Sequence, residues 1–227
     1  MRWPFARPHP DPKVRAYLDA TPRHLRGKTP CDDLNFVVLD AEATGFDIAR
    51  DRMLSLATIP VRAGAMAVEH SRGWLIRQPA APVTSAVAVH GILPSETAQG
   101  SAEADVLHEL LGLLAGAVIV GHHVHFDAAL IDAAFHRHLG TRLRNPLLDT
   151  ARLAITTLEA FRRTGYANQR PPRLEEVCAD CGIEMMARHT AAGDAFTTAE
   201  IFLLLTARLR RRLGRQLRLS DLPVELH

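Results

Sequence analysis

The sequence predicts an α/β domain in which a mixed β-sheet lies between two layers of helices. Three observations support this prediction: a short apolar run at 35–39, two longer runs at 53–62 and 65–77 around Gly64, and alternating helical and strand patterns after residue 100. Runs joined by a tight turn form an antiparallel hairpin, whereas strands separated by helices pair in parallel. In such sheets, ligands bind at the carboxyl ends of the central strands.

The strand predictions rest on residue type and length. Asn35–Leu39 reads Asn-Phe-Val-Val-Leu, a β-branched and aromatic run that is typical of a buried strand. Met53–Arg62 and Ala65–Arg77 are long enough for the two strands of a hairpin, and Val118–Val120 and Leu147–Leu148 are expected to be short strands later in the chain. These segments would form the middle layer.

The helix predictions rest on apolar residues that recur with helical spacing. Ser101–Ala115 has this pattern, and Ser101 is expected to be its N-cap. Further helices are predicted at Phe126–Leu139, at 150–162, at Leu174–Cys181 and at Ala195–Leu213, with a polar loop at Gly165–Pro172.

Composition divides the chain into three parts. Residues 1–33 are rich in proline and arginine, contain one helical pattern at Val14–Ala20, and are expected to form an extension outside the main core. Residues 34–206 carry the predicted domain, and residues 207–227 are expected to be a basic helix end and tail.

The bulk composition is that of an ordinary globular protein, with 47% hydrophobic and 23% charged residues. The net charge of +2 is too small to indicate nucleic-acid binding by itself. No apolar run approaches the roughly 20 residues needed to span a bilayer, and prolines interrupt the N-terminus too often for a signal peptide. We therefore expect a cytoplasmic protein without a membrane partner.

Two carboxylates directly follow the first predicted strand. Asp40 and Glu42 lie two residues apart, so on a strand they would share one face beside buried apolar residues. They would repel one another and lose hydration, and a divalent cation would remove that penalty. A charged turn at the strand end is the alternative, and this motif alone does not decide between the two.

Three histidines and an aspartate follow the strand at 118–120, in the segment from Gly121 to Asp127. Such a cluster can indicate a zinc or transition-metal site. However, the histidines occupy a loop that opens a helix, and they do not share one helical face. We favour Asp127 as a single carboxylate aimed at the strand-end cleft, with an all-histidine metal site as the alternative.

A third cluster precedes the last predicted helix. His189 lies in a loop, and Asp194 lies five residues later, near the start of the helix. Alone, Asp194 would be interpreted as a helix cap and His189 as a surface residue. Because two other acidic clusters each follow a strand, a shared site becomes the stronger interpretation.

Together these motifs resemble the DEDDh exonucleases, a family that includes the epsilon proofreading subunit of bacterial DNA polymerase III, ribonuclease T and oligoribonuclease. The resemblance runs from about Phe36 to Leu205, with the motifs in the family's order and spacing. It rests on Asp40-x-Glu42, Phe126-Asp127, His189 with Asp194, Val89–Ile92, and Leu148-Asp149-Thr150.

The resemblance implies a ribonuclease H-like three-layer fold with a mixed, mostly parallel central sheet flanked by helices. It also implies a 3′–5′ exonuclease that hydrolyses phosphodiester bonds and releases nucleoside monophosphates. His189 would be the general base, and two Mg²⁺ or Mn²⁺ ions would be bound by Asp40, Glu42, Asp127 and Asp194. The implied substrate-binding residues are Thr44, Gly45, Phe46, His90 and Phe126, and Asp149 would be a supporting residue.

The implied partner is a nucleic acid with a free 3′ end. Single-stranded DNA is expected first, RNA is the alternative, and a DNA polymerase subunit is a further candidate partner. Two residues depart from the family pattern: Ala43 replaces a threonine and His123 replaces an asparagine. Neither change removes a ligand or the base, so the departures bear on how the 3′ end and the loop are held.

Two other functions remain open at this stage. One is a non-catalytic module that binds nucleic acid or a polymerase, and the other is a different two-metal phosphohydrolase, such as a nucleotide phosphatase. The intact acidic residues argue against the first. Release of a nucleoside monophosphate from an oligonucleotide would distinguish the exonuclease from the second.

Two further motifs have competing interpretations. Cys178 and Cys181 form a CxxC without a second pair, so packed core thiols are favoured over a metal or redox site. The basic tail would either extend the grip on substrate or serve as a solvated helix end with favourable charge. Its arginines are Arg208, Arg210, Arg211, Arg212, Arg215 and Arg218.

Overall fold

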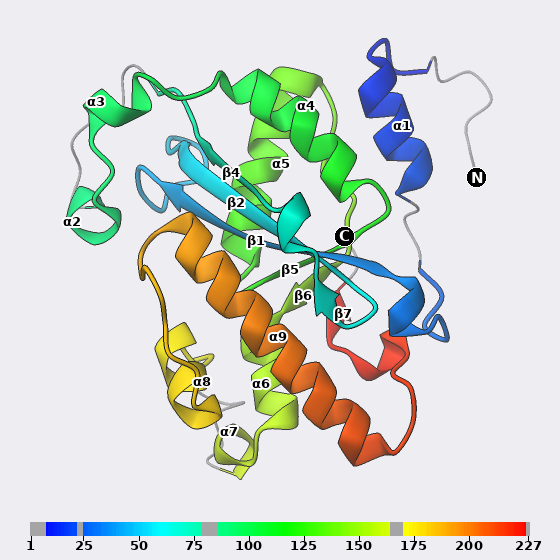
Figure 1. Cartoon of the computed structure of the whole chain (residues 1–227). Helices are drawn as coiled ribbons and strands as arrows, with labels where there is room; N and C mark the ends of the chain where they lie inside the picture. Colours follow the sequence, from blue (N-terminus) through cyan, green and yellow to red (C-terminus); the bar gives the residue numbers. More distant parts are fainter. Residues whose placement is uncertain (1–7, 22–24, 79–85, 164–169, 226–227) are drawn as a thin grey trace.

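The computed structural model describes residues 8–21, 25–78, 86–163 and 170–225, which form a seven-stranded sheet between two layers of helices (Figure 1). The central strands β1 (Asn35–Ala43), β5 (Val118–Gly121) and β6 (Leu147–Asp149) are parallel to one another. On one side, β2 (Met53–Arg62) pairs antiparallel with β1, and on the other β7 (Val224–Glu225) pairs antiparallel with β6. The predicted mixed sheet with parallel central strands is confirmed.

The prediction of one long strand at 65–77 is wrong, because this segment is interrupted. It forms β3 (Ala65–Met66), a 3₁₀ turn at Val68–His70, and β4 (Arg72–Leu75), which also pairs with β2. The cause is Pro60 of β2. The amide of Ala67 donates to the carbonyl of Pro60 at 2.8 Å, but proline has no N–H to return the bond. The carbonyl of Ala67 accepts from His70 instead, at 2.9 Å.

The two helical layers cover opposite faces of the sheet (Figure 1). One layer contains α1 (Pro12–Ala20), α4 (Glu103–Leu114) and α5 (His125–Leu139), and the other contains α6 (Thr150–Thr157), α8 (Leu174–Cys181) and α9 (Ala191–Leu213). The side chains of β1 alternate between them: Val37 and Leu39 pack with the first layer, and Phe36 and Val38 with the second. Shorter helices are α2 (Val87–His90), α3 (Pro94–Thr97) and α7 (Glu159–Arg163).

Three helix boundaries differ from the predictions. Ser101 is not an N-cap, because its backbone bridges to the sheet edge through Leu75 and Arg77, and α4 begins after it with Ala102 as the cap residue. The predicted helix at 150–162 breaks at Leu158, which adopts an extended backbone and buries its side chain in the core. Helix α9 begins at Ala191 instead of Ala195, since Thr190 caps its first turn.

The N-terminal helix belongs to the core, so the expectation of an extension outside it is wrong for α1. Val14 and Tyr17 are buried against α4 and α5, and the ring of Tyr17 packs edge-on against Phe135 at 5.9 Å. The Tyr17 hydroxyl donates to Asn145 Oδ1 at 2.7 Å and accepts from the amide of Arg144 at 2.7 Å. Burial raises the pKa of Tyr17 to about 12.

The C-terminal segment is also packed against the domain. Its buried apolar side chains are Leu209, Leu217, Leu219 and Leu222. Arg210 pairs with Asp32 at 2.7 Å, and Arg212 donates to the carbonyl of Thr156 near the end of α6 at 3.3 Å. These arginines therefore stabilise the fold itself. In the described parts of the chain, no helix combines the length and apolarity needed to cross a membrane.

Candidate active site

Three carboxylates meet at the carboxyl end of β1. Asp40 and Glu42 extend the face of β1 that carries Phe36 and Val38, and this face points toward α9. Asp194 lies in the first turn of α9. One oxygen from each of the three carboxylates lies within 4.8 Å of the others. Among the described residues, these three carboxylates form a group whose donor atoms lie close enough together to hold one cation.

Asp127 completes the acidic cluster from the first turn of α5. Its Oδ1 accepts a hydrogen bond from the amide of Ala41 at 2.9 Å, which fixes the carboxylate beside the backbone of β1 between Asp40 and Glu42. Asp127 is buried, and its negative charge acts on Asp40. The structure therefore brings all four predicted acidic residues to one region, with Asp127 adjoining the tight group of three.

The pKa values of these carboxyl groups are raised, and burial is the largest cause for each. The pKa of Asp40 lies well above its usual range through burial and then through the charges of Asp127, Asp194 and Glu42. Burial raises the pKa of Glu42 to about 7 and that of Asp127 to about 7. Burial also raises the pKa of Asp194, although Arg188 opposes that shift. Ionised together, these groups require positive charge nearby.

A divalent cation fits this donor set. Asp194 Oδ1 is buried and has no hydrogen-bond partner among the described residues, although a buried carboxylate oxygen normally accepts at least one hydrogen bond. Hard cations such as Mg²⁺ and Mn²⁺ prefer oxygen ligands of this kind. Asp40, Glu42 and Asp194 would hold such an ion, with Asp127 beside them.

The loop that carries His189 is tightly built. Ala187 and His189 both have positive φ angles, 46° and 63°, which side chains other than glycine adopt rarely. The Thr190 hydroxyl donates to the carbonyl of Ala187 at 2.7 Å and accepts from the amide of Gly193 at 3.1 Å. A Cβ on Gly193 would lie 2.3 Å from the Ala187 carbonyl oxygen, so only glycine allows this approach. The loop thereby places the half-buried His189 at the cavity that Asp40, Glu42 and Asp194 also line.

Two adjoining cavities of roughly 410 and 390 Å³ open on the carboxylates. Both are lined by Asp40, Ala41, Glu42, Phe46, His122 and His123. The first is further lined by Arg173, Leu174, Glu175, Arg188, His189 and Asp194. The second is further lined by Ala43, Gly45, Ala86, Val89, His90, Phe126 and Asp127.

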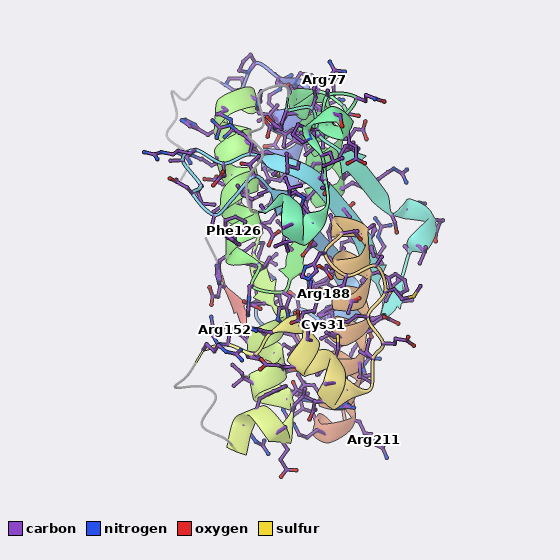
Figure 2. All side chains as sticks on the ribbon, turned by 90° about the vertical axis from the view of Figure 1, so that its left-hand side faces the viewer. Cys31, Arg77, Phe126, Arg152, Arg188 and Arg211 are labelled. Atoms are coloured by element: carbon purple, nitrogen blue, oxygen red, sulfur yellow. The ribbon has the colours of Figure 1, made fainter. Side chains whose placement is uncertain are left out.

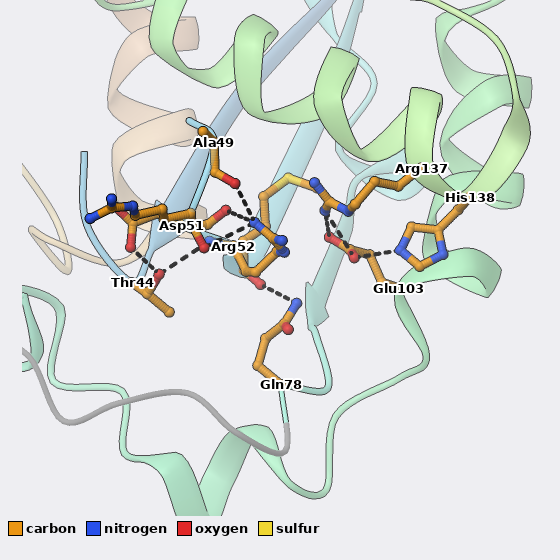
Figure 3. A network of polar contacts seen from close by, with 10 residues as sticks. Thr44, Ala49, Asp51, Arg52, Gln78, Glu103, Arg137 and His138 are labelled. Atoms are coloured by element: carbon orange, nitrogen blue, oxygen red, sulfur yellow. Dashed lines mark hydrogen bonds and ion pairs between the residues drawn. The ribbon is translucent and has the colours of Figure 1, made fainter. Parts of the chain in front are cut away.

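The predicted substrate residues divide into two groups. Gly45, Phe46, His90 and Phe126 line the second cavity, where Phe46 is 90% exposed and its ring centroid lies 5.5 Å from that of Phe126. Thr44 is buried and does not line either cavity. Its hydroxyl donates to Asp51 Oδ1 at 2.6 Å, within the network of Figure 3. Thr44 therefore helps to hold the loop that carries Phe46.

Two of the histidines that follow β5 pack together, with the ring centroids of His122 and His123 4.6 Å apart, and a ring nitrogen of each bonds to the carbonyl of Pro172. Among the described residues, these histidines do not belong to a group of three or more metal-type donors, so the geometry does not support an all-histidine metal site. His122 bonds through its two ring nitrogens to Thr150 Oγ1 and to the carbonyl of Pro172, both at 2.9 Å. Burial, and then the neighbouring His123, lower the pKa of His122 to about 4. His125 lies 3.2 Å from Glu225. His122 thus fastens the Pro172 segment to the loop that follows β5, and His125 fastens β7 to the start of α5.

Asp149 holds two backbone amides beside the acidic cluster. Its Oδ1 accepts from the amide of Ala151 at 2.8 Å, which caps α6, and from the amide of His123 at 3.1 Å. His123 has a positive φ of 57°, so Asp149 stabilises a strained backbone beside the site. Cys178 of the CxxC is buried in the core, and burial raises its thiol pKa to about 11, as packing predicts.

Sequence reasoning missed several residues that shape the site. Arg188 bonds to both Asp194 and Glu175, and Asp51 holds the loop of Phe46. Gly193 leaves room for the carbonyl of Ala187 in the His189 loop. The sequence could have indicated two of these residues, since Arg188 immediately precedes His189 and Gly193 immediately precedes Asp194. Asp51 lies eleven residues beyond Asp40 in a polar loop and had no such signal.

Comparisons with known proteins define the class. The chain and the crystal structure of E. coli exonuclease I in complex with a dT13 oligonucleotide share a fold, with a TM-score of 0.65 and 24% identity over 80% of this chain and 43% of that chain. This likeness shows the shared fold, a mixed sheet with parallel central strands flanked by helices. Residues 37–202 match the family model RNase_T, described as exonuclease. The chain belongs to this exonuclease family and is a hydrolase, which confirms the family expected from the motifs.

Several proteins named as DNA polymerase III subunits or enzymes are similar to most of this chain. DNA polymerase III subunit epsilon of Aquifex aeolicus is 28% identical over 201 residues, which are 87% of this chain and 93% of that protein. A DNA polymerase III subunit epsilon-like protein of Rhodobacter capsulatus is 33% identical over 82% of this chain. The PolC-type DNA polymerase III of Thermotoga maritima is 27% identical over 87% of this chain. The chain spans only 25% and 14% of the last two proteins.

Proposed function

We propose that this protein is a 3′–5′ exonuclease that hydrolyses phosphodiester bonds at nucleic-acid 3′ ends and releases nucleoside monophosphates. The observation that carries the proposal is the convergence of Asp40, Glu42 and Asp194 within 4.8 Å, with the unpartnered Oδ1 of Asp194 among them. Membership of the exonuclease family supports the reaction class.

Asp40, Glu42, Asp127 and Asp194 would hold two Mg²⁺ or Mn²⁺ ions. Such ions, when bound, would supply Lewis-acid chemistry: they would stabilise negative charge at the phosphodiester and make a water molecule easier to deprotonate. Asp127 contributes rigidity, because the amide of Ala41 holds one of its oxygens at 2.9 Å. The raised pKa values of the four carboxyl groups support this assignment, since they reflect buried negative charge that a cation would compensate.

His189 would be the general base that takes the proton of the attacking water. It lines the first cavity with Asp40 and Asp194, and its backbone amide donates to Asp194 Oδ2 at 3.2 Å. A neutral imidazole nitrogen can accept the proton of a water molecule that lies beside it. The loop, strained at Ala187 and His189, would keep the ring near the carboxylates.

The substrate would be single-stranded DNA with a free 3′ end, with RNA as the alternative. The aromatic pair of Phe46 and Phe126 supports this, because exposed rings stack on bases without reading sequence. The exonuclease I neighbour was crystallised with a dT13 oligonucleotide, and several relatives carry DNA polymerase III names. Association with a polymerase and a cytoplasmic location are further parts of the proposal.

The decisive experiment incubates 5′-labelled DNA and RNA oligonucleotides with the purified protein in Mg²⁺, in Mn²⁺ and in EDTA. We expect a ladder of 3′-shortened products and release of nucleoside monophosphates, both abolished by EDTA. His189→Ala should lower turnover by at least about 100-fold while Mn²⁺ binding persists. Asp40→Asn should impair both.

Each competing function gives a distinct outcome. A nucleotide phosphatase would release phosphate from nucleotides and leave oligonucleotides intact. A non-catalytic module would bind oligonucleotides without shortening them. Either pattern, or full activity of His189→Ala, would overturn the corresponding part of the proposal.

A further inference from the structure

Arg188 joins the acidic cluster to a second helix. Its Nη1 donates to Asp194 Oδ2 at 2.6 Å, and its Nη2 donates to Glu175 Oε1. Glu175 lies in the first turn of α8, and Asp194 lies in the first turn of α9. Figure 2 shows Arg188 between these helices, in the middle of the molecule. A planar guanidinium can hold two carboxylates in a fixed relative geometry, which an ammonium group cannot.

We propose that Arg188, held by Glu175, is a positioning residue that orients Asp194 for cation binding and fixes the loop of His189. This inference rests on the proposed function and extends it to residues outside the four carboxylates and the base. Arg188 acts through Asp194 and His189, so it is distinct from a residue that contacts substrate.

The orientation of Asp194 follows from how its two oxygens are used. Oδ2 accepts two hydrogen bonds, from Arg188 Nη1 at 2.6 Å and from the amide of His189 at 3.2 Å. Within the described parts of the chain, Oδ1 has no hydrogen-bond partner, and it belongs to a buried side chain that is 7% exposed. One oxygen is thus fully engaged with the protein, and the other is left for a cation.

The pair also balances charge without neutralising the site. Arg188 carries one positive charge and Glu175 one negative charge, and the two side chains form an ion pair. Together they therefore add no net charge to the acidic cluster.

The test compares Arg188→Met, Arg188→Lys and Glu175→Gln with wild type. Arg211→Met is the control, because it removes one positive charge from the exposed end of α9, away from Arg188 in Figure 2. Three quantities are measured: Mn²⁺ affinity by calorimetry, kcat and KM on a labelled oligonucleotide, and Tm in EDTA. Mn²⁺ affinity is measured without substrate, so it tests the inference even if no nuclease activity is found.

Arg188→Met and Arg188→Lys should each weaken Mn²⁺ binding and lower kcat by about 10- to 100-fold, with KM within about twofold of wild type. Lysine should not restore wild-type Mn²⁺ affinity or kcat, because it keeps the positive charge but lacks the planar guanidinium that bonds both carboxylates. Glu175→Gln should cause the same kind of change at smaller size, and adding it to Arg188→Met should have little further effect. Arg211→Met should match wild type.

Other outcomes would overturn the inference. If Arg188→Met raised KM but left kcat and Mn²⁺ affinity unchanged, Arg188 would be a substrate contact. If Arg188→Lys matched wild type, charge alone would suffice. If Arg188→Met failed to fold, the Glu175→Gln variant would provide the test. Wild-type Mn²⁺ affinity and kcat in that variant would show that the Glu175–Arg188 ion pair does not position Asp194. An inactive wild type that still bound Mn²⁺ would refute only the proposed function.

Discussion

The hydroxyl of Thr44 donates to Oδ1 of Asp51 at 2.6 Å and thereby closes the loop that carries Phe46 (Figure 3). Asp51 Oδ2 accepts from the amide of Asp47 at 2.7 Å, so one carboxylate holds the loop at two points. The amide of Arg52 donates to the Thr44 hydroxyl at 3.1 Å and completes the connection. A Cβ on Gly45 would lie 2.6 Å from Asp51 Oδ2, which explains the glycine. An exposed aromatic side chain is thus presented by a rigid loop.

Asp51→Ala should raise KM on single-stranded oligonucleotides by about 3- to 10-fold and change kcat less. The substitution removes hydrogen bonds worth about 1 kcal/mol each, which loosens the loop without touching the carboxylates that would bind metal. Steady-state kinetics measures the change. Asp47→Ala is the matched control, because this neighbouring aspartate is exposed and does not join the two ends of the loop. Equal effects of the two variants would contradict the anchoring role of Asp51.

Phe46→Ala should raise KM without lowering Tm. The side chain is 90% exposed, so its removal forfeits almost no burial, whereas stacking of an aromatic ring on a base contributes about 1–3 kcal/mol. We expect KM to rise by at least about fivefold, and Phe46→Trp to retain wild-type KM. A fall in Tm with unchanged KM would assign Phe46 a structural role instead.

Asp40→Asn should stabilise the metal-free protein at pH 8. Burial and neighbouring negative charges raise the pKa of Asp40 well above its value in the unfolded chain. Between those two pKa values the folded state binds more protons, so the stability of wild type falls as pH rises. Asparagine removes this dependence, and we expect a gain of about 1 kcal/mol, or roughly 2–4 °C in Tm. Thermal unfolding in EDTA should show a smaller gain at pH 5. An equal gain at both pH values would contradict this explanation.

Mn²⁺ binding should weaken as pH falls below about 7. Burial raises the pKa of both Glu42 and Asp127 to about 7, and a cation binds only the ionised carboxylates. Protons therefore compete with the ion, and we expect the affinity to drop by about tenfold or more between pH 8 and pH 6. Calorimetric titration at several pH values would measure it. Glu42→Gln should flatten the profile, and a flat profile in wild type would refute the competition.

Tyr17→Ala should destabilise the whole domain, not only the N-terminal helix. The side chain is 1% exposed and its hydroxyl bridges Asn145 and the amide of Arg144, so its loss should reduce the free energy of unfolding by about 3–5 kcal/mol. Tyr17→Phe removes only the hydroxyl and should reduce it by about 1–2 kcal/mol. Chemical denaturation measures both. A loss below about 1 kcal/mol for Tyr17→Ala would mean that α1 is peripheral.

Local pattern was sufficient to predict most elements of the fold. Short runs of apolar, largely β-branched residues predicted β1 and β5, and the helical spacing of apolar residues predicted α4, α5 and α8. The predictions failed where a distant residue decides the backbone. Pro60 interrupts the strand that returns beside it, and Leu158 leaves the helix to fill the core. Neither effect can be derived without knowing the partner strand or the core.

The candidate site was predictable where its residues follow strands. Asp40, Glu42 and Asp127 each follow a buried apolar run, and parallel strands bring such positions to one edge of the sheet. Arg188, Glu175 and Asp51 act through contacts between side chains of separate elements or of one folded loop. Such contacts depend on three-dimensional packing, so the sequence pattern alone does not reveal them.

Pro60 has one more effect, on how the molecule meets other chains. A long, regular edge strand exposes a row of free amides and carbonyls that can recruit a strand from another molecule. Here the margin outside β2 is divided into pieces of two and four residues, β3 and β4, with a tight turn between them. Because of Pro60, β3 and β4 do not form one continuous edge strand here, and this disfavours aggregation by strand pairing between molecules.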